Sequence, residues 1–237
     1  MVLKMETLTA DRVKKLALGE GADLCGIAPV ERFDGAPEGF RPEDIFPAAK
    51  SVVVIAKRLP EAALRSNSPM TYKVASDLVK IEVAHVTYNL SIKLQDLGTI
   101  AVPVLGEPYM YWDAEKEEGR GLLSMRHAAM LSGLGVLGRN TLLINERFGN
   151  RLTFGSLLLD AHLEGDPVAN YKACSDDCNL CIKSCPARAL DGKTVAQRLC
   201  RQYSQTTTPK GFEIYTCKTC RVVCPMGAGI IKKNQSG

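Results

Sequence analysis

Long apolar runs, a secretory leader and a strong excess of charge are all missing from this sequence of 237 residues. No apolar run approaches the roughly 20 residues that a membrane-spanning helix needs, so a membrane protein is not expected. The chain does not open on a charged segment followed by an apolar one, which favours a reducing, cytoplasmic compartment. The 30 basic and 26 acidic residues leave a formal net charge of +4, which is too small and too dispersed to favour nucleic-acid binding.

Apolar residues, by contrast, are plentiful enough for a sizeable core. They make up 46% of the chain, and its length suits one large domain with a smaller appendage. The segment 51–56 is β-branched and nearly continuously apolar, which predicts a strand buried on both faces. The segment 72–97 has apolar residues three and four apart and ends before Gly98, which predicts a long helix. Further helices are expected from Thr9 to Gly19 and at 122–131, and further strands at 24–28, 99–105, 141–145 and 152–160.

These helices and strands alternate without an internal repeat. Such an order predicts a three-layer α/β or α+β domain. A loop-rich, ferredoxin-like segment is expected to follow from about Asp166-Pro167.

Cysteine is nearly absent from the first three quarters of the chain and is concentrated in the last. Cys25 lies alone in an apolar stretch and is expected to be a small buried strand residue. The other eight form two groups, each ending in a CxxC turn that is followed after three residues by Cys-Pro. This is the ligand inventory of two 4Fe-4S clusters, because each cluster needs four thiolates. The eight are Cys174, Cys178, Cys181, Cys185, Cys200, Cys217, Cys220 and Cys224.

In the bacterial two-cluster arrangement, each group gives three ligands to its near cluster and its Cys-Pro cysteine to the far one. The expected sets are Cys174, Cys178 and Cys181 with Cys224, and Cys200, Cys217 and Cys220 with Cys185. Two spacings depart from the simplest pattern, since three residues separate the first two cysteines and sixteen separate Cys200 from Cys217. A disulfide framework is disfavoured by a reducing compartment. A pair of four-thiolate zinc sites is disfavoured because both groups continue to a third cysteine and a proline.

A glycine-rich stretch at 133–138 places Gly133, Gly135 and Gly138 in the spacing of a dinucleotide-binding loop. Such a loop follows a strand and precedes a helix, whereas residues 126–131 here favour helix and those from Thr141 favour strand. Two other interpretations stay open. The stretch is either a glycine turn that ends a helix, or a loop whose backbone amides approach a flat or anionic ligand.

Taken with the cysteine groups, the stretch from Arg126 to Ile144 and the segments 154–156 and 159–163 resemble epoxyqueuosine reductases, which are similar in turn to reductive dehalogenases. The resemblance spans most of residues 10–229. It implies an α+β chain, with a nitroreductase-like, three-layer, corrinoid-binding domain at 1–165 and a ferredoxin-like domain with two 4Fe-4S clusters at 166–237. In that family the clusters pass single electrons to a base-off cobalamin. The matching stretch implies cofactor contacts from His127, Gly133, Gly135, Gly138, Arg139 and Asn140.

The family also carries an acid in a Tyr-x4-Asp-Tyr-His motif before a long helix. Tyr72 and Asp77 keep the spacing of that motif, but Leu78 and Val79 replace its Tyr-His. The resemblance implies Asp77 as the catalytic proton donor, with Tyr72 as the alternative, since a tyrosine acts in the dehalogenase relatives. The rival interpretation makes Asp77 an ordinary helix acid.

Three functions are compatible with these features. The first is a corrinoid-dependent iron-sulfur reductase, the second an electron-transfer protein, and the third a protein that binds and reduces a corrinoid without substrate chemistry of its own. The roughly 160 residues ahead of the cysteine groups favour a bound small cofactor over a simple carrier. The chain ends soon after Cys224, without the helical repeats that grasp transfer RNA in epoxyqueuosine reductases. A small-molecule substrate and an electron donor such as a ferredoxin or flavodoxin are therefore expected, and nucleic acid is not.

Overall fold

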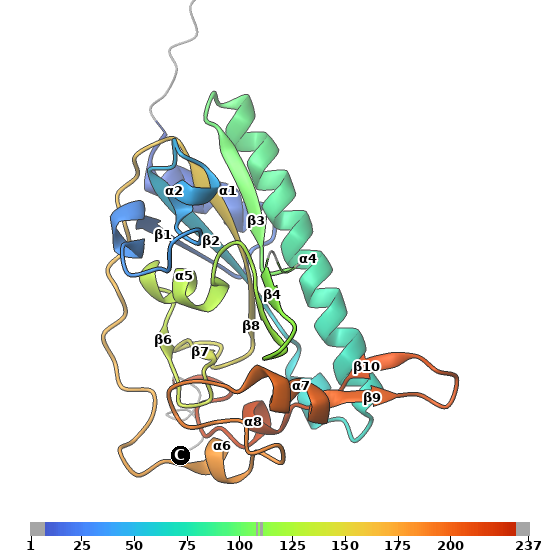
Figure 1. Cartoon of the computed structure of the whole chain (residues 1–237). Coiled ribbons are helices and arrows are strands. Elements are labelled where there is room, and N and C mark those ends of the chain that lie inside the picture. The colour runs from blue at the N-terminus through green and yellow to red at the C-terminus, as the bar shows by residue number, and fades with distance from the viewer. Residues whose placement is uncertain (1–7, 108, 110, 231–237) are drawn as a thin grey trace, which may run out of the picture.

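A four-stranded antiparallel sheet lies at the centre of the larger part of the molecule (Figure 1). The computed structural model describes residues 8–107, 109 and 111–230. The strand order is β1 (Leu24–Pro29), β2 (Ser51–Arg58), β8 (Leu152–Leu159) and β3 (Ala101–Leu105). Strand β2 lies inside the sheet, and its residues 51–56 are all buried. The predicted doubly buried strand is confirmed.

Helices cover both faces of this sheet. The alternation of side chains along β2 sends Val53 and Ile55 to one face, where they pack with α1 (Ala10–Gly19) and α4 (Pro69–Asp96). Val52 and Val54 point to the other face, where they pack with α5 (Met125–Leu131) and the short helix η1 (Val30–Phe33). The chain is therefore of the mixed α and β class, with one apolar core on each side of the sheet.

The two long helices begin and end close to where the sequence predicts. Thr9 caps α1, since its Oγ1 accepts a hydrogen bond from the backbone N–H of Arg12 at 3.2 Å. Helix α4 starts earlier than expected because Pro69 occupies its first turn, where a missing N–H costs nothing. It ends before Gly98, whose φ of +85° suits glycine. Within the described ranges, no helix combines the length and apolar character that crossing a membrane requires.

The cysteine-rich tail packs below one end of the sheet (Figure 1). It contains three short helices and one hairpin, connected by irregular loops. These are α6 (Leu180–Lys183), α7 (Gln197–Ser204), α8 (Thr219–Val222) and the strands β9 (Gln205–Thr207) and β10 (Glu213–Tyr215). Lys218 attaches the tail to the body, because its Nζ donates to the carbonyls of Ala63 and Ser66 at the end of α3 (Glu61–Arg65).

Several small elements were not predicted. The short helix α2 (Pro42–Ile45) precedes β2, and the hairpin of β4 (Tyr111–Asp113) and β5 (Glu118–Arg120) extends beside the sheet. A second hairpin joins β6 (Val136–Leu137) to β7 (Leu143–Ile144). The strand expected at 141–145 is thus shortened to two residues, since Thr141 has a φ of +60° that interrupts extended backbone.

Candidate functional site

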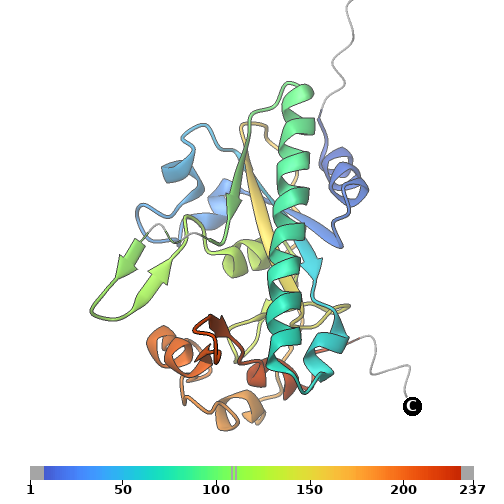
Figure 2. The same ribbon diagram turned by 90° about the vertical axis from the view of Figure 1, so that its right-hand side faces the viewer.

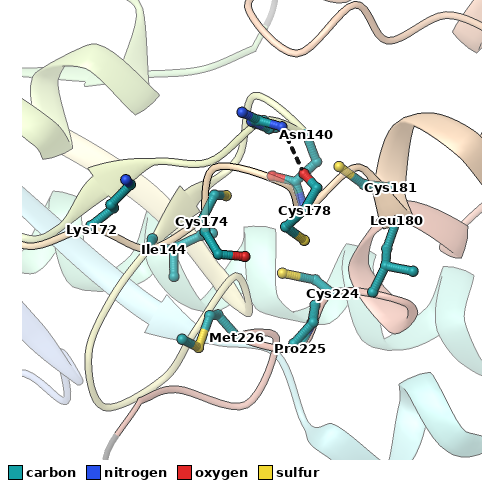
Figure 3. A pocket seen from close by; sticks show the side chains of 13 residues that line it. Asn140, Ile144, Lys172, Cys174, Cys178, Leu180, Cys181, Cys224, Pro225 and Met226 are labelled. Atoms are coloured by element: carbon teal, nitrogen blue, oxygen red, sulfur yellow. Dashed lines mark hydrogen bonds between the residues drawn. The ribbon is translucent and has the colours of Figure 1, made fainter.

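Four cysteines line a cavity of about 470 Å³ within the tail. Cys178 lies in a turn closed by its own N–H and the carbonyl of Ser175, Cys181 lies on α6, and Cys224 follows α8. Figure 3 shows these side chains and that of Cys174 around one space, beside the apolar side chains of Ile144, Leu180 and Met226. We call these four cysteines the outer set. They are the set expected from the spacing of the sequence.

The other four cysteines line a second and larger cavity, of about 930 Å³. We call them the inner set, and they are Cys185, Cys200, Cys217 and Cys220. This cavity lies between the tail and the body, because its walls also include η1, α5 and the end of the β4–β5 hairpin. The structure therefore brings together the same two groups of four that the spacing predicts.

Four of the eight tail thiols have raised pKa values. Burial raises the pKa of the Cys220 thiol to about 11. Burial also raises the pKa of Cys181 and of Cys224, and nearby Cys174 raises each of them further. Burial and then Cys217 raise the pKa of Cys200. Burial therefore disfavours the thiolate form of Cys181, Cys200, Cys220 and Cys224 unless a cationic group lies beside them.

The donor set consists of soft ligands. Among the described residues, no three His, Cys, Asp or Glu side chains converge closely enough to hold one metal ion. A four-iron cluster distributes its thiolates over four iron atoms, so its ligands lie farther apart than those of one zinc ion. Four thiols around a cavity, without a carboxylate in its wall, fit a soft metal group such as zinc or an iron-sulfur cluster.

Arg139 and Asn140 hold the two cysteine loops. The guanidinium of Arg139 donates to the carbonyls of Asp176 and Cys178, both at 2.9 Å. The amide of Asn140 is buried and donates to the carbonyl of Cys220 at 3.1 Å. Both residues also line the outer cavity, and Asn140 lines the inner one as well. Their direct contacts are therefore with the loops that present the cysteines.

The three glycines of the 133–138 stretch do not appear in the wall of either cavity. A Cβ at Gly133 would lie 2.4 Å from the carbonyl oxygen of Pro167, and one at Gly135 would lie 2.4 Å from that of Ile144. A Cβ at Gly138 would meet the side chain of Ile144 at 2.5 Å. Helix α5 precedes the stretch and β6 follows Gly135, so of the interpretations left open the helix-ending turn is the one that the structure supports. Here the glycines permit close packing of backbone on backbone.

His127 and Arg126 lie on α5 at the wall of the inner cavity. The Nδ1 of His127 lies 2.7 Å from Oγ of Ser124. Although His127 as a residue is exposed, partial burial of its ring and the neighbouring Arg126 lower its pKa. Arg126 donates to the carbonyl and hydroxyl oxygens of Thr141 at 2.6 and 2.8 Å. Its charge lies within electrostatic reach of Cys200 and Cys220.

The β4–β5 hairpin is bound to the helix that carries Cys200. The amide of Gln197 on α7 makes two hydrogen bonds to the backbone of Gly119, at 3.1 and 3.2 Å. The guanidinium of Arg201 stacks over the rings of Tyr109 and Trp112, 4.7 and 5.0 Å from their centroids. These contacts close one side of the inner cavity.

Tyr72 and Asp77 lie elsewhere. Both are on α4, and neither lines the inner or the outer cavity. Asp77 forms an ion pair with Lys73 one turn earlier, and 45% of its side chain is exposed. The structure does not bring this pair to the cysteine-lined cavities, and a catalytic role for either stays a prediction.

Several residues that shape the site were not among the predicted site residues. Arg126, Gln197 and Arg201 act through contacts with residues that are distant along the chain. Asn150 is another, since its amide donates to the carbonyl of Arg221 at 3.2 Å.

Comparison with known proteins gives relatives of two kinds. The chain is 30% identical over 207 residues to an epoxyqueuosine reductase of Listeria monocytogenes, which covers 81% of this chain and 52% of that protein. It is 26% identical over 229 residues to a tetrachloroethene reductive dehalogenase of Desulfitobacterium hafniense, which covers 89% of this chain and 38% of that protein. The chain thus spans about half or less of the length of these relatives. No protein-family model matches it.

Solved structures of the same two kinds share the fold. The epoxyqueuosine reductase of Streptococcus thermophilus superposes with a TM-score of 0.65 at 20% identity, covering 92% of this chain and 66% of that one. A reductive dehalogenase whose structure was interpreted in terms of B12-dependent dehalogenation superposes with a TM-score of 0.69 at 18% identity, covering 91% of this chain and 31% of that one. The chain is therefore similar in sequence to epoxyqueuosine reductases and reductive dehalogenases, and it shares the fold of both.

Proposed function

We propose that this chain is a corrinoid-dependent iron-sulfur oxidoreductase. The observation that carries the proposal is that the eight tail cysteines lie in two sets of four, and that the inner set opens onto a large cavity shared with the body. When bound, two 4Fe-4S clusters would carry single electrons and a corrinoid would supply cobalt-centred reduction of a small substrate. An external donor such as a ferredoxin or flavodoxin would provide the electrons.

In this proposal each part of the chain has a separate task. We assign residues 1–165 to a nitroreductase-like domain and residues 166–237 to a ferredoxin-like domain, although 1–7 and 231–237 lie outside the described residues. Asp166 is still held by the body, because its carboxylate accepts from the N–H of Ile27 at 2.8 Å. The tail therefore separates from the body in space only near Cys174, a few residues after the proposed boundary.

The inner cavity has the size and lining that a flat, largely apolar ligand requires. Its volume of about 930 Å³ lies near the upper end of the range for small-molecule sites, roughly 300–1,000 Å³. Phe33, Phe40 and Tyr109 contribute aromatic walls, and Met125 and Met130 contribute adaptable apolar ones. The imidazole of His127, kept neutral by its lowered pKa, offers a polar contact at the wall.

A first experiment tests the cofactors. We expect anaerobically purified protein to contain about eight irons and as much sulfide per chain. Addition of base-off cobalamin should then change its visible spectrum saturably. About eight irons without a cobalamin response would leave an electron-transfer protein, and zinc without iron would exclude the proposal.

A second candidate is a protein that binds and reduces a corrinoid without substrate chemistry of its own. The position of Asp77 and Tyr72 outside the inner cavity favours it, because a proton donor must lie within hydrogen-bond reach of the reacting atoms. Full cobalamin reduction together with failure to turn over any organohalide or epoxide would support this candidate.

The Asp77→Asn variant tests the proton-donor assignment directly. If Asp77 supplies the proton, turnover should fall at least 100-fold, the lower end for general acid catalysis, while cobalamin binding is unchanged. Asp96→Asn at the exposed end of the same helix is the matched control and should keep full turnover. Unchanged turnover in both variants would remove Asp77 from the reaction, and Tyr72→Phe would then test the alternative.

A further inference from the structure

Apart from its cysteines, the wall of the inner cavity carries charge of one sign. Four arginines line it, whereas no aspartate, glutamate or lysine of the described residues does. The four are Arg32, Arg120, Arg126 and Arg201. A cavity lined by charge of one sign concentrates ligands of the opposite sign. The composition of this wall therefore favours an anionic ligand.

Each of the four guanidinium groups is held by neutral partners. Arg32 donates to the backbone carbonyls of Leu131 and Asp166, both at 2.7 Å. The guanidinium carbon of Arg120 lies 5.7 Å from the ring centroid of Phe40. The other two are held by the carbonyl, hydroxyl, amide and aromatic groups described above. None of the four forms an ion pair within the described part of the chain, so no neighbouring carboxylate offsets its charge.

A cluster at the inner set would account for two of these four charges. A 4Fe-4S cluster with four thiolate ligands is a net anion. The charges of Arg126 and Arg201 both reach the Cys200 thiol, so these two arginines face the inner set. The main charges that act on the Cys200 and Cys220 thiols do not include Arg32 or Arg120. A cluster therefore leaves these two arginines without a counter-charge.

Arg32 and Arg120 belong to the side of the cavity that the body forms. Arg32 lies on η1, and Arg120 ends β5 and stacks on Phe40 in the loop between η1 and α2. Figure 2 shows that loop, in blue, above the β4–β5 hairpin and the cysteine-rich tail below the hairpin. Phe33 and Phe40 line the same side of the cavity. Guanidinium groups and apolar surface thus lie together there.

We propose that the inner cavity takes an organic anion as its substrate. Arg120 and Arg32 hold the carboxylate or phosphate group of this substrate, and its apolar body lies beside Phe40. The proposal rests on the proposed function, which makes this cavity the place of the reaction. A planar guanidinium group forms two parallel N–H···O hydrogen bonds to such an oxyanion. A neutral molecule of the same shape gains only the apolar contacts, so the cavity selects its substrate by charge.

Isothermal titration calorimetry of the anaerobically purified full-length chain tests the proposal with benzoate, phenyl phosphate and benzamide. All three contain a phenyl ring, and benzamide matches benzoate in shape but is neutral. The tighter-binding of the two anions should bind at least about tenfold more tightly than benzamide, because hydrogen bonds to charged groups are the stronger ones. Binding of benzamide as tight as that of both anions, or no binding of either anion, would overturn the proposal.

The Arg120→Gln variant tests the position of the anion. It should weaken binding of the preferred anion at least about tenfold and leave benzamide binding and iron content unchanged. Arg188→Gln removes the same charge from an exposed residue of the tail that does not line the cavity, and this control should bind the anion as the wild type does. An equal loss in both variants would reveal a general effect of charge and would overturn the proposal.

Cobalamin and cobinamide distinguish the substrate from the corrinoid as the source of the anion. Cobalamin contains a phosphate in its nucleotide loop, and cobinamide lacks it. Arg120→Gln should leave the ratio of the two affinities unchanged. A fall in cobalamin affinity alone would assign Arg120 to the corrinoid phosphate and overturn the proposal. The calorimetry with benzoate requires no corrinoid, so a chain without a cobalamin response would remove the proposed function while the preference for anions is still measured.

Discussion

The two cysteine-lined cavities differ in what surrounds them. Apart from Arg139, Asn140 and Ile144, the outer set is surrounded only by the tail, in a cavity half the volume of the other. The inner set shares its cavity with both η1 and α5 of the body, and Arg126 and Arg201 bring positive charge to it. The same kind of donor set thus occurs in two settings. A ligand in the large cavity would meet the inner set, so electrons that enter at the outer set would pass inward.

Replacing one cysteine of either set should have the largest effect of the variants considered, because it should remove the iron of that set. Cys220→Ala should leave about four irons of about eight, because one thiolate of the inner set is lost. Cys178→Ala should also leave about four irons, but these should be the irons held by the inner set. Iron and sulfide analysis with electron paramagnetic resonance would show two different residual signals. Identical residual signals would mean that the two cavities do not hold separate clusters.

Replacing Arg126 should change the reduction potential of the cluster expected at the inner set but not that of the cluster expected at the outer set. A buried cation stabilises the more negative, reduced state of a nearby cluster. Arg126→Gln should therefore lower the potential of the inner cluster by roughly 60 mV, which is a tenfold change for one electron. The outer cluster serves as the internal control and should keep its potential. A redox titration in which both clusters shift equally would contradict a local role for Arg126.

Gln197 should matter only for the inner cavity. Gln197→Leu removes two hydrogen bonds to the backbone of Gly119, each contributing about 1 kcal/mol. We expect faster hydrogen exchange at residues 111–120 and weaker cobalamin binding, with normal iron content. Gln202→Leu, which removes a longer bond at 3.3 Å between exposed side chains, is the matched control and should have little effect.

Of these variants, Tyr171→Phe should have the smallest effect, which should be a small loss of stability near the outer set. Its hydroxyl donates to the carbonyl of Ile144, and burial raises its pKa to about 12. Tyr171→Phe should lower the free energy of unfolding by about 1 kcal/mol. The corresponding fall in Tm is roughly 2–4 °C for a chain of this size, with the inner cluster unaffected. A changed inner potential in this variant would show that the two cavities are coupled.

The elements that sequence reasoning found are those with a strong local pattern. Strand β2 is apolar without interruption because both of its faces are buried, and α4 repeats apolar residues at helical spacing. The β4–β5 hairpin was missed because it is anchored by distant residues such as Gln197, which lies 78 residues away in the sequence. The glycine spacing at 133–138 matched a ligand-binding loop, but backbone crowding against Pro167 and Ile144 also demands glycine.

By itself, the sequence determined the number of thiols, and its spacing predicted two sets of four in which the Cys-Pro cysteine of each group joins the set of the other group. Only the tertiary structure decided which of the two sets meets the body. It places the inner set against α5 through contacts such as Asn140 to Cys220, which join residues 80 positions apart. The tertiary structure also shows that one face of α4 packs on the sheet and that the other face is exposed. An apolar pattern indicates that a helix face tends to be buried, but it does not indicate which part of the protein buries it.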